Sequence, residues 1–173
     1  WTYDATVRYS DDKNTVSITP FISRIRNPII FESSLYKNGI SDRDPHGIEA
    51  SYERYFGVLS YRVNYTYTIG EDLIDIPKHE VGNSVLFCKD KWSGSIRASY
   101  QTSKFYATFN NDTFETSKVR ENPGMLVGAT VNYALSKNVE FYMVANNALD
   151  RTYTDGGYKK HGIEAYAGCK LTF

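Results

Sequence analysis

Polar and apolar residues alternate with a period of two along most of this sequence. The segment 57–68 shows the pattern clearly: its odd positions carry Leu59, Tyr61, Val63, Tyr65 and Tyr67, and its even positions carry Ser60, Arg62, Asn64, Thr66 and Thr68. Successive side chains of a β-strand point to opposite faces, so such a segment has one apolar and one polar face. The segments 3–10, 95–101, 127–133 and 139–146 behave in the same way. The pattern predicts an all-β protein.

Breaks in the alternation divide the chain into about nine predicted strands. Their approximate bounds are 2–10, 15–31, 38–55, 57–69, 78–89, 91–109, 124–135, 138–147 and 161–173. Short turns lie near residues 11–14, 55–57, 89–91 and 136–138, and longer polar stretches lie near 31–38, 70–78, 110–123 and 149–160. Short and long connections therefore alternate, as periplasmic turns and outer loops do in an outer-membrane β-barrel.

This alternation also predicts the direction of each strand. The first and the last strand should both run from the outer side towards the periplasm. Bacterial single-chain barrels have an even number of strands and start from the periplasm. An odd number of strands that starts on the outer side predicts further strands upstream, so we expect this chain to be the C-terminal segment of a larger barrel.

A soluble β-sandwich would show the same alternation, with its apolar faces in a dry centre between two sheets. Two features favour an antiparallel transmembrane β-barrel. The apolar positions include many Tyr and Ala residues, which suit lipid contact, and the polar positions carry charges in mid-strand, which a water-filled lumen tolerates. We predict that the lumen is lined by Glu49, Arg62, Arg97, Glu140 and Glu164. There these side chains should order water and neighbouring strands rather than select a substrate.

Composition supports a membrane protein and argues against other classes. Aromatic residues make up 15% of the chain, with 15 Tyr and 9 Phe, and tyrosine suits membrane interfaces because one end is apolar and the other is wetted. No segment has the run of about 18 apolar residues that a membrane-spanning helix needs, so the strands must make any crossing. Lys plus Arg equal Asp plus Glu at 20 each, which argues against a nucleic-acid partner. Cys88 and Cys169 fit no metal-ligand spacing, and we expect free thiols, with a disulfide as the alternative.

The last predicted strand, 161–173, has an aromatic end. This ending resembles the insertion signal of bacterial outer-membrane barrels, in which a terminal aromatic residue follows an alternating strand. The residues that match are Tyr166, Gly168, Leu171 and Phe173. The resemblance implies the barrel-assembly machinery as a partner; an ordinary final strand that ends in Phe is the alternative.

Further motifs resemble those of the TonB-dependent receptor family, in the same order and over nearly the whole chain. Residues 21–29 (FISRIRNPI) are similar to its F-x-x-x-I-x-N-x-I strand, and residues 36–39 with 47–49 are similar to its N-x-G and G-V-E strand. Residues 65–68 with 76–79 resemble its tyrosine-rich hairpin that ends in P-x-H. Residues 147–153 (NALDRTY) resemble its N-L-F-D-x-x-Y motif, with Ala148 and Leu149 in place of Leu-Phe.

The resemblance implies a barrel of the 22-strand type in the bacterial outer membrane, closed by an N-terminal plug. Such a receptor imports a scarce nutrient of the siderophore-iron, haem or cobalamin type, and the TonB complex acts on the plug. We expect this chain to supply wall, lumen lining and outer loops, with the C-terminus in the periplasm. The plug and the remaining strands would belong to the same or another chain. For ligand contact we predict the long loops 110–123 and 150–160, through Phe114, Lys118, Arg120, Tyr153 and Tyr158.

Three alternatives remain at this stage. The chain could be a truncated or split barrel that serves as a structural subunit of a surface complex, a small independent barrel acting as a pore or adhesin, or a soluble sandwich. No catalytic motif occurs, so we expect neither an enzyme nor a cofactor. The sequence His-Gly-Ile-Glu-Ala occurs at 46–50 and again at 161–165. We interpret it as a repeated barrel hairpin; the alternative is a metal site built from His46 and His161, and we predict no metal.

Overall fold

A computed structural model describes residues 1–32, 35–39, 42–71, 73–110, 112–113, 115–155, 158–160 and 162–173. Within these ranges every regular element is a β-strand, which confirms the predicted fold class. None of these residues belongs to a helix long and apolar enough to cross a membrane.

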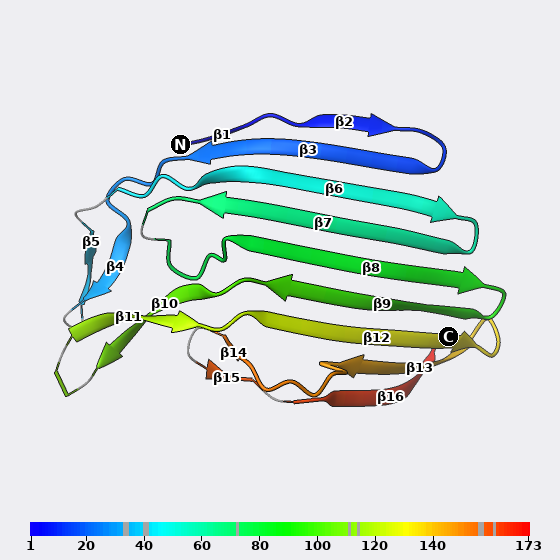
Figure 1. The fold of residues 1–173 in the computed structure, drawn as a ribbon. Coiled ribbons are helices and arrows are strands. Elements are labelled where there is room, and N and C mark those ends of the chain that lie inside the picture. Colours follow the sequence, from blue (N-terminus) through cyan, green and yellow to red (C-terminus); the bar gives the residue numbers. More distant parts are fainter. Residues whose placement is uncertain are drawn as a thin grey trace.

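A single antiparallel sheet of ten strands, which we call the wall sheet, dominates the structure (Figure 1). Its members are β1 (Thr2–Asp4), β2 (Val7–Ser10), β3 (Asn14–Ser23), β6 (His46–Phe56), β7 (Leu59–Ile69), β8 (His79–Lys89), β9 (Trp92–Gln101), β12 (Gly124–Ala134), β13 (Val139–Asn146) and β16 (Glu164–Leu171). Because β1 and β2 both pair with β3, they form one interrupted strand. The wall is therefore nine strands wide, as the sequence pattern predicts.

Three two-stranded hairpins project from one end of the wall sheet, which we call the loop end (Figure 1). They pair β4 (Ile29–Glu32) with β5 (Leu35–Asn38), β10 (Lys104–Asn110) with β11 (Glu115–Glu121), and β14 (Thr154–Asp155) with β15 (Tyr158–Lys159). The short turns all lie at the opposite end, the turn end. Long and short connections thus separate to opposite ends, as predicted, and β1 and β16 both run from the loop end to the turn end.

Three predicted strands were too long, and the loop hairpins explain why. The strands predicted at 15–31 and 91–109 leave the wall at Ser23 and Gln101, and the one predicted at 38–55 joins the wall only at His46. In each case alternation continues into a hairpin that pairs with itself beyond the wall. Alternation with a period of two indicates an extended backbone, but it does not indicate which strand pairs with which.

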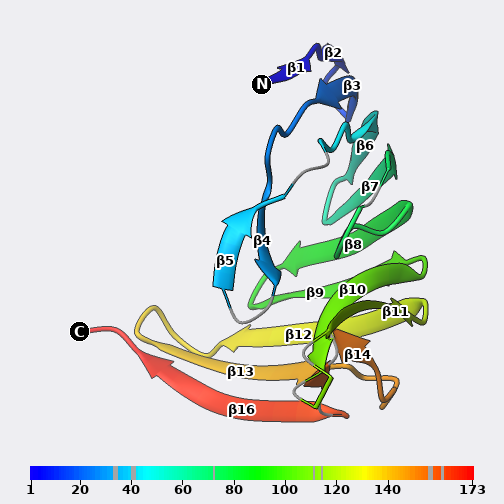
Figure 2. The same ribbon diagram turned by 90° about the vertical axis from the view of Figure 1, so that its left-hand side faces the viewer.

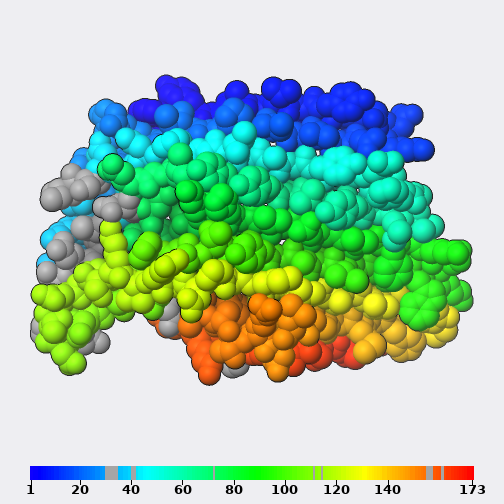
Figure 3. Space-filling model, viewed as in Figure 1, coloured from blue at the N-terminus to red at the C-terminus, as the bar shows by residue number. Residues whose placement is uncertain are grey.

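The wall sheet is curved, with one concave and one convex face (Figure 2). No described aliphatic or aromatic side chain is buried, so the structure has no dry centre between stacked sheets. The sandwich alternative is therefore wrong for the described part of the chain. Large apolar side chains are exposed on the convex face instead, including Ile96 at 59% and Met143 at 66%. Figure 3 shows this face as an unbroken surface from the first wall strand to the last part of the chain.

Tyrosine hydroxyls contact three of the polar side chains that occur on the convex face. The Tyr52 hydroxyl donates to Asn14 Oδ1 at 3.0 Å, and the Tyr61 hydroxyl donates to Asn83 Oδ1 at 2.9 Å. The Tyr65 hydroxyl lies 2.8 Å from His79 Nδ1. An unpaired polar group in hydrocarbon costs several kcal/mol, so these contacts make an otherwise apolar surface compatible with lipid. Cys88 and Cys169 are both free, as predicted.

Gly47 marks a close approach between two wall strands. A Cβ atom there would collide with the main-chain oxygen of Tyr67, and the ring of Phe21 lies over the same position. Gly82 is a mid-strand glycine with room for a side chain, since the nearest atom to its Cβ position is Asn64 Nδ2 at 3.9 Å.

We therefore expect Gly47→Ala to lower the free energy of unfolding by about 2 kcal/mol, the usual range for overpacking. Gly82→Ala should change it by less than about 0.5 kcal/mol. Denaturant titration of the two variants in the same detergent measures the difference. Equal stability of the two variants would contradict the close approach.

Candidate functional site

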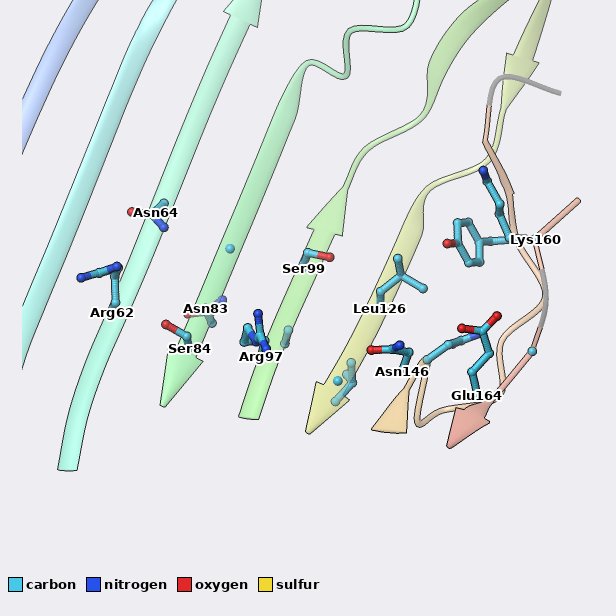
Figure 4. A pocket seen from close by; sticks show the side chains of 17 residues that line it. Arg62, Asn64, Asn83, Ser84, Arg97, Ser99, Leu126, Asn146, Lys160 and Glu164 are labelled. Carbon is cyan, nitrogen blue, oxygen red and sulfur yellow. The ribbon is translucent and has the colours of Figure 1, made fainter. Parts of the chain in front are cut away.

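The charged residues predicted from alternation all lie on one face of the wall sheet. Cross-strand register joins Glu53 to Arg62, Arg62 to Ser84, Ser84 to Arg97, Arg97 to Gly128 and Asn146 to Glu164. Glu49 and Glu140 alternate onto the same face as this row, opposite Thr66 and Lys170. This is the concave face, seen from close by in Figure 4. The five predicted residues thus share one face, and a role in lining a lumen stays a proposal.

A cavity of about 640 Å³, which we call the concave hollow, lies along this row (Figure 4). The hollow exists because the residues around Arg97 are small. Ser84 and Gly128 are its cross-strand partners, and Gly82 and Ser99 lie one step further along the same face. Because the side chains on the neighbouring strands are short, they do not pack against the Arg97 side chain.

The hollow carries an excess of positive charge. The Arg62 guanidinium donates to Glu53 Oε1 at 2.8 Å, so its charge is balanced within the wall. Glu164 accepts a hydrogen bond from the Tyr166 hydroxyl at 3.2 Å. The Arg97 side chain forms no hydrogen bond or ion pair within the described part of the chain, although its main chain pairs with the neighbouring strands. An exposed guanidinium of this kind can bind a carboxylate or phosphate through two parallel hydrogen bonds.

The connection between β13 and β16 closes one side of the hollow. Its residues Tyr153 and Lys160 line the cavity together with Glu164. Figure 4 shows Lys160 and Glu164 on this same side of the hollow, away from Arg62. Loop residues and wall residues therefore contribute to one cavity.

The motif at 147–153 holds this connection in place. Asn147 is 8% exposed; its Nδ2 donates to the Arg151 carbonyl at 2.7 Å, and its Oδ1 accepts from the Arg151 amide at 3.2 Å. Asp150 Oδ1 accepts from the Ile163 amide at 2.9 Å, which ties the start of the connection to its end. Asn147 and Asp150 adopt φ of 47° and 49°, a region that Asn and Asp tolerate better than most residues. Asn147 and Asp150 are therefore structural, and we call this arrangement the Asn147–Asp150 latch.

Asn27, which belongs to another of the family motifs, has a similar conformation. Asn27 adopts φ of 48° where the chain leaves β3 and enters the β4–β5 hairpin. The flanking residue Ile25 forms an antiparallel bridge with Arg43, and the Gly39 amide donates to the Pro28 carbonyl at 2.7 Å. Asn27 thus marks the base of a loop hairpin rather than a ligand contact.

The two copies of His-Gly-Ile-Glu-Ala share a tightly packed glycine. A Cβ atom at Gly162 would collide with Asp150 Oδ1 of the latch, much as one at Gly47 would collide with the neighbouring strand. This supports the interpretation as a repeated barrel hairpin. His161 lies outside the described residues, and His46 Nδ1 lies 3.0 Å from the Asp44 carbonyl oxygen. Within the ranges described, no three His, Cys, Asp or Glu residues are grouped as a metal would require.

The predicted loop contacts do not converge on one site. Tyr153 lines the concave hollow, whereas Lys118 lines a separate cavity at the base of the β10–β11 hairpin. Arg120 donates to Ser103 Oγ at 3.0 Å, and Tyr158 is 77% exposed on β15. Phe114 lies outside the described residues. Lys160 lies at the end of the predicted loop 150–160 but was not among the named contacts, and the structure places it in the concave hollow.

The residues of the predicted insertion signal lie on the edge strand β16 and just after it. Gly168 lies opposite Tyr142, whose ring occupies the space that a Cβ atom would need. Tyr166 and Leu171 are exposed at 54% and 58%, and the terminal Phe173 is fully exposed. These positions are accessible to a partner, and their role in assembly stays a prediction.

Comparison with known proteins agrees with the fold. The family model described as "TonB dependent receptor-like, beta-barrel" matches residues 1–148. No curated protein matches the sequence. Among solved structures, the copper transporter OprC superposes with a TM-score of 0.80 at 14% identity, over 99% of this chain and 30% of that one. The ferripyoverdine receptor of Pseudomonas aeruginosa gives 0.75 at 16% identity, over 98% and 26%. The FrpB iron transporter from Neisseria meningitidis gives 0.75 at 12% identity, over 99% and 30%.

This chain thus spans less than a third of the length of each of these three proteins. At such low identity the superpositions show the fold alone. The family model covers most of the chain, and its members are receptors and transporters of the bacterial outer membrane rather than enzymes. This chain belongs to the TonB-dependent receptor family and forms part of the β-barrel domain.

Proposed function

We propose that this chain is the C-terminal barrel segment of a receptor that imports a scarce nutrient across the outer membrane. The observation that carries the proposal is the open wall sheet. Strands β1–β2 and β16 form its two edges and do not pair with each other, while its concave face is polar and its convex face apolar. Unpaired edge strands within a membrane are costly, so further strands must complete the barrel. A plug from the same or another chain would occupy the lumen.

The arrangement of connections supports an orientation. Long hairpins at one end and short turns at the other are typical of outer loops and periplasmic turns. The loop end would face the cell exterior, and the C-terminus would lie in the periplasm. On this proposal the concave hollow lines the lumen, where Arg97 would face the plug or a passing ligand. The TonB complex would act on the plug, and the barrel-assembly machinery would recognise the end of β16.

The neighbours suggest the class of nutrient. The similar structures are described as a receptor for ferripyoverdine, a receptor for enterobactin and a copper transporter. We propose an iron-siderophore, haem or cobalamin complex for this chain.

Uptake measurements test the proposal directly. Cells that lack the gene should lose energised uptake of one radiolabelled member of these classes. The complete gene should restore uptake, and it should fail to do so in a strain without TonB. If no labelled nutrient depends on the gene, although the protein reaches the outer membrane, it would instead be a structural subunit.

Ligand affinity should depend on Tyr153 more than on Tyr158. Tyr153 lies in the concave hollow, whereas Tyr158 is exposed on β15 and serves as the matched control. We expect Tyr153→Ala to raise the ligand Kd about tenfold, because an aromatic contact with the ligand is lost. Tyr158→Ala should raise the Kd less than about twofold. Titration of the imported ligand into purified receptor measures both. A larger effect of Tyr158→Ala would place recognition outside the hollow.

A further inference from the structure

A second cavity, which we call the loop-end cavity, lies where the connection 70–78 meets the base of the β10–β11 hairpin. Its volume is about 690 Å³. Its walls combine three lysines with large apolar side chains: Lys78, Lys104 and Lys118, with Leu73, Ile76 and Phe105. No carboxylate lines it within the described ranges. This combination of cationic and apolar walls suits an amphiphile with a negatively charged head.

Two connections that are far apart in sequence build this cavity together. The Asp75 amide donates to the Phe105 carbonyl at 2.7 Å, and the Thr102 amide donates to the His79 carbonyl at 3.0 Å. Lys104 is 8% exposed and pairs with the carboxylate of Glu121, Nζ to Oε2, at 3.7 Å. Main-chain hydrogen bonds and a buried ion pair therefore hold the walls in position.

The cavity adjoins the convex face at the level of its last tyrosines. His79 lies opposite Tyr67 in the register of β7 and β8, with ring centroids 5.0 Å apart. Lys78 Nζ lies 5.7 Å from the centre of the Tyr67 ring. Tyrosine and lysine at the end of an apolar band mark the level of lipid head groups. In Figure 1 the connection 70–78 lies at the loop end of β7 and β8.

The net charge around the cavity favours an anion. Glu121 balances Lys104, while Lys78, which forms no ion pair within the described ranges, adds a further ammonium group. Of the acidic residues of the same connection, Glu71 and Asp75 are exposed and do not line the cavity, and Asp72 lies outside the described residues. Ammonium groups beside an apolar surface bind lipid phosphate while the acyl chain covers the apolar part.

We propose that the loop-end cavity binds the phosphate head group of a membrane lipid. Lys78 would contact the phosphate, and an acyl chain would run past Ile76 and Phe105 onto the convex face. The proposal depends on the convex face meeting lipid and does not depend on which nutrient is imported. Its occupant is a lipid, since the cavity joins the lipid-facing surface rather than the concave hollow.

Native mass spectrometry of the complete receptor in mild detergent tests this site. The probes are dioleoyl phosphatidic acid, dioleoylglycerol with the same chains but no phosphate, and inorganic phosphate. We expect one phosphatidic acid to bind at least about tenfold more tightly than dioleoylglycerol, the effect of one charge-assisted contact. Lys78→Gln should remove this preference, Lys78→Arg should keep it, and Lys159→Gln on β15 is the matched surface control.

Three outcomes would overturn the proposal. They are unchanged lipid preference in Lys78→Gln, loss of the same size in Lys159→Gln, and full displacement of the lipid by inorganic phosphate at equal concentration, which would indicate a free-anion site. Loss of heat-modifiable migration in gels identifies a misfolded variant. If Lys78→Gln is misfolded, the lipid preference of Lys78→Arg tests the proposal instead, and loss of that preference would overturn it. Nutrient uptake by the unmodified receptor is measured separately, so failure of the lipid site and failure of the transport proposal give different results.

Discussion

Replacing Ile96 with arginine is expected to lower the free energy of unfolding of the membrane-inserted protein by about 2 to 4 kcal/mol. Ile96 lies in the middle of β9 on the convex face and is 59% exposed. A charged group there would enter the centre of the lipid, where its hydration is lost. Denaturant titration in lipid vesicles, followed by tryptophan fluorescence, measures the change.

Leu86→Arg is the matched control for this experiment. Leu86 is also a large exposed aliphatic residue, at 44%, but it alternates onto the concave face opposite Ser95. An arginine there would remain in water, so we expect a change of less than about 1 kcal/mol. If Leu86→Arg costs as much as Ile96→Arg, the assignment of the two faces to lipid and water is wrong.

Replacing Asn147 with alanine is expected to release the connection between β13 and β16. The change removes both hydrogen bonds to the Arg151 main chain and puts alanine at φ of 47°, which costs a non-glycine residue about 1 to 2 kcal/mol. With each lost buried hydrogen bond at about 1 kcal/mol, the local cost is about 3 kcal/mol. Hydrogen exchange of amides 148–163 should accelerate about a hundredfold, while exchange in β12 stays unchanged.

Arg151→Ala provides the control, because the Asn147–Asp150 latch uses only the main chain of Arg151. Its exchange rates should stay within about threefold of the natural protein. In the same samples, Asn147→Ala should also weaken ligand binding, since Tyr153 and Lys160 leave the concave hollow together. Rapid exchange in Arg151→Ala, or slow exchange in Asn147→Ala, would show that the latch is not what holds the connection.

The alternation of polar and apolar residues within each strand was enough to predict which side chains share a face. Arg62 and Arg97 stand on different strands, yet each has polar residues two positions away and apolar residues one position away. Any extended strand with this pattern presents them to the polar side, whatever its neighbours are. Asn27, Asn147 and Asp150 could also be recognised as motif residues. Their structural role could not be predicted, because the spacing of residues does not indicate where φ is positive.

The concave hollow could not be predicted because it depends on register. Gly82, Ser84, Ser99 and Gly128 surround Arg97 only once β8, β9 and β12 are aligned, and a shift of one residue would send half of them to the other face. The same limit made the predicted strands 15–31, 38–55 and 91–109 too long. Phe105 continues the alternating pattern of the strand predicted at 91–109, yet it belongs to a hairpin beyond the wall.

The sequence by itself determined that this protein is all-β, that its wall has nine strands with two chemically different faces, and that long and short connections alternate. These properties follow from local backbone geometry, which places every second side chain on the same side. Only the tertiary structure decided that one sheet curves without a second sheet against it, that its edges remain open, and that connections complete the concave hollow and the loop-end cavity. Those results depend on pairing between residues far apart in the chain, and local periodicity carries no information about such pairing.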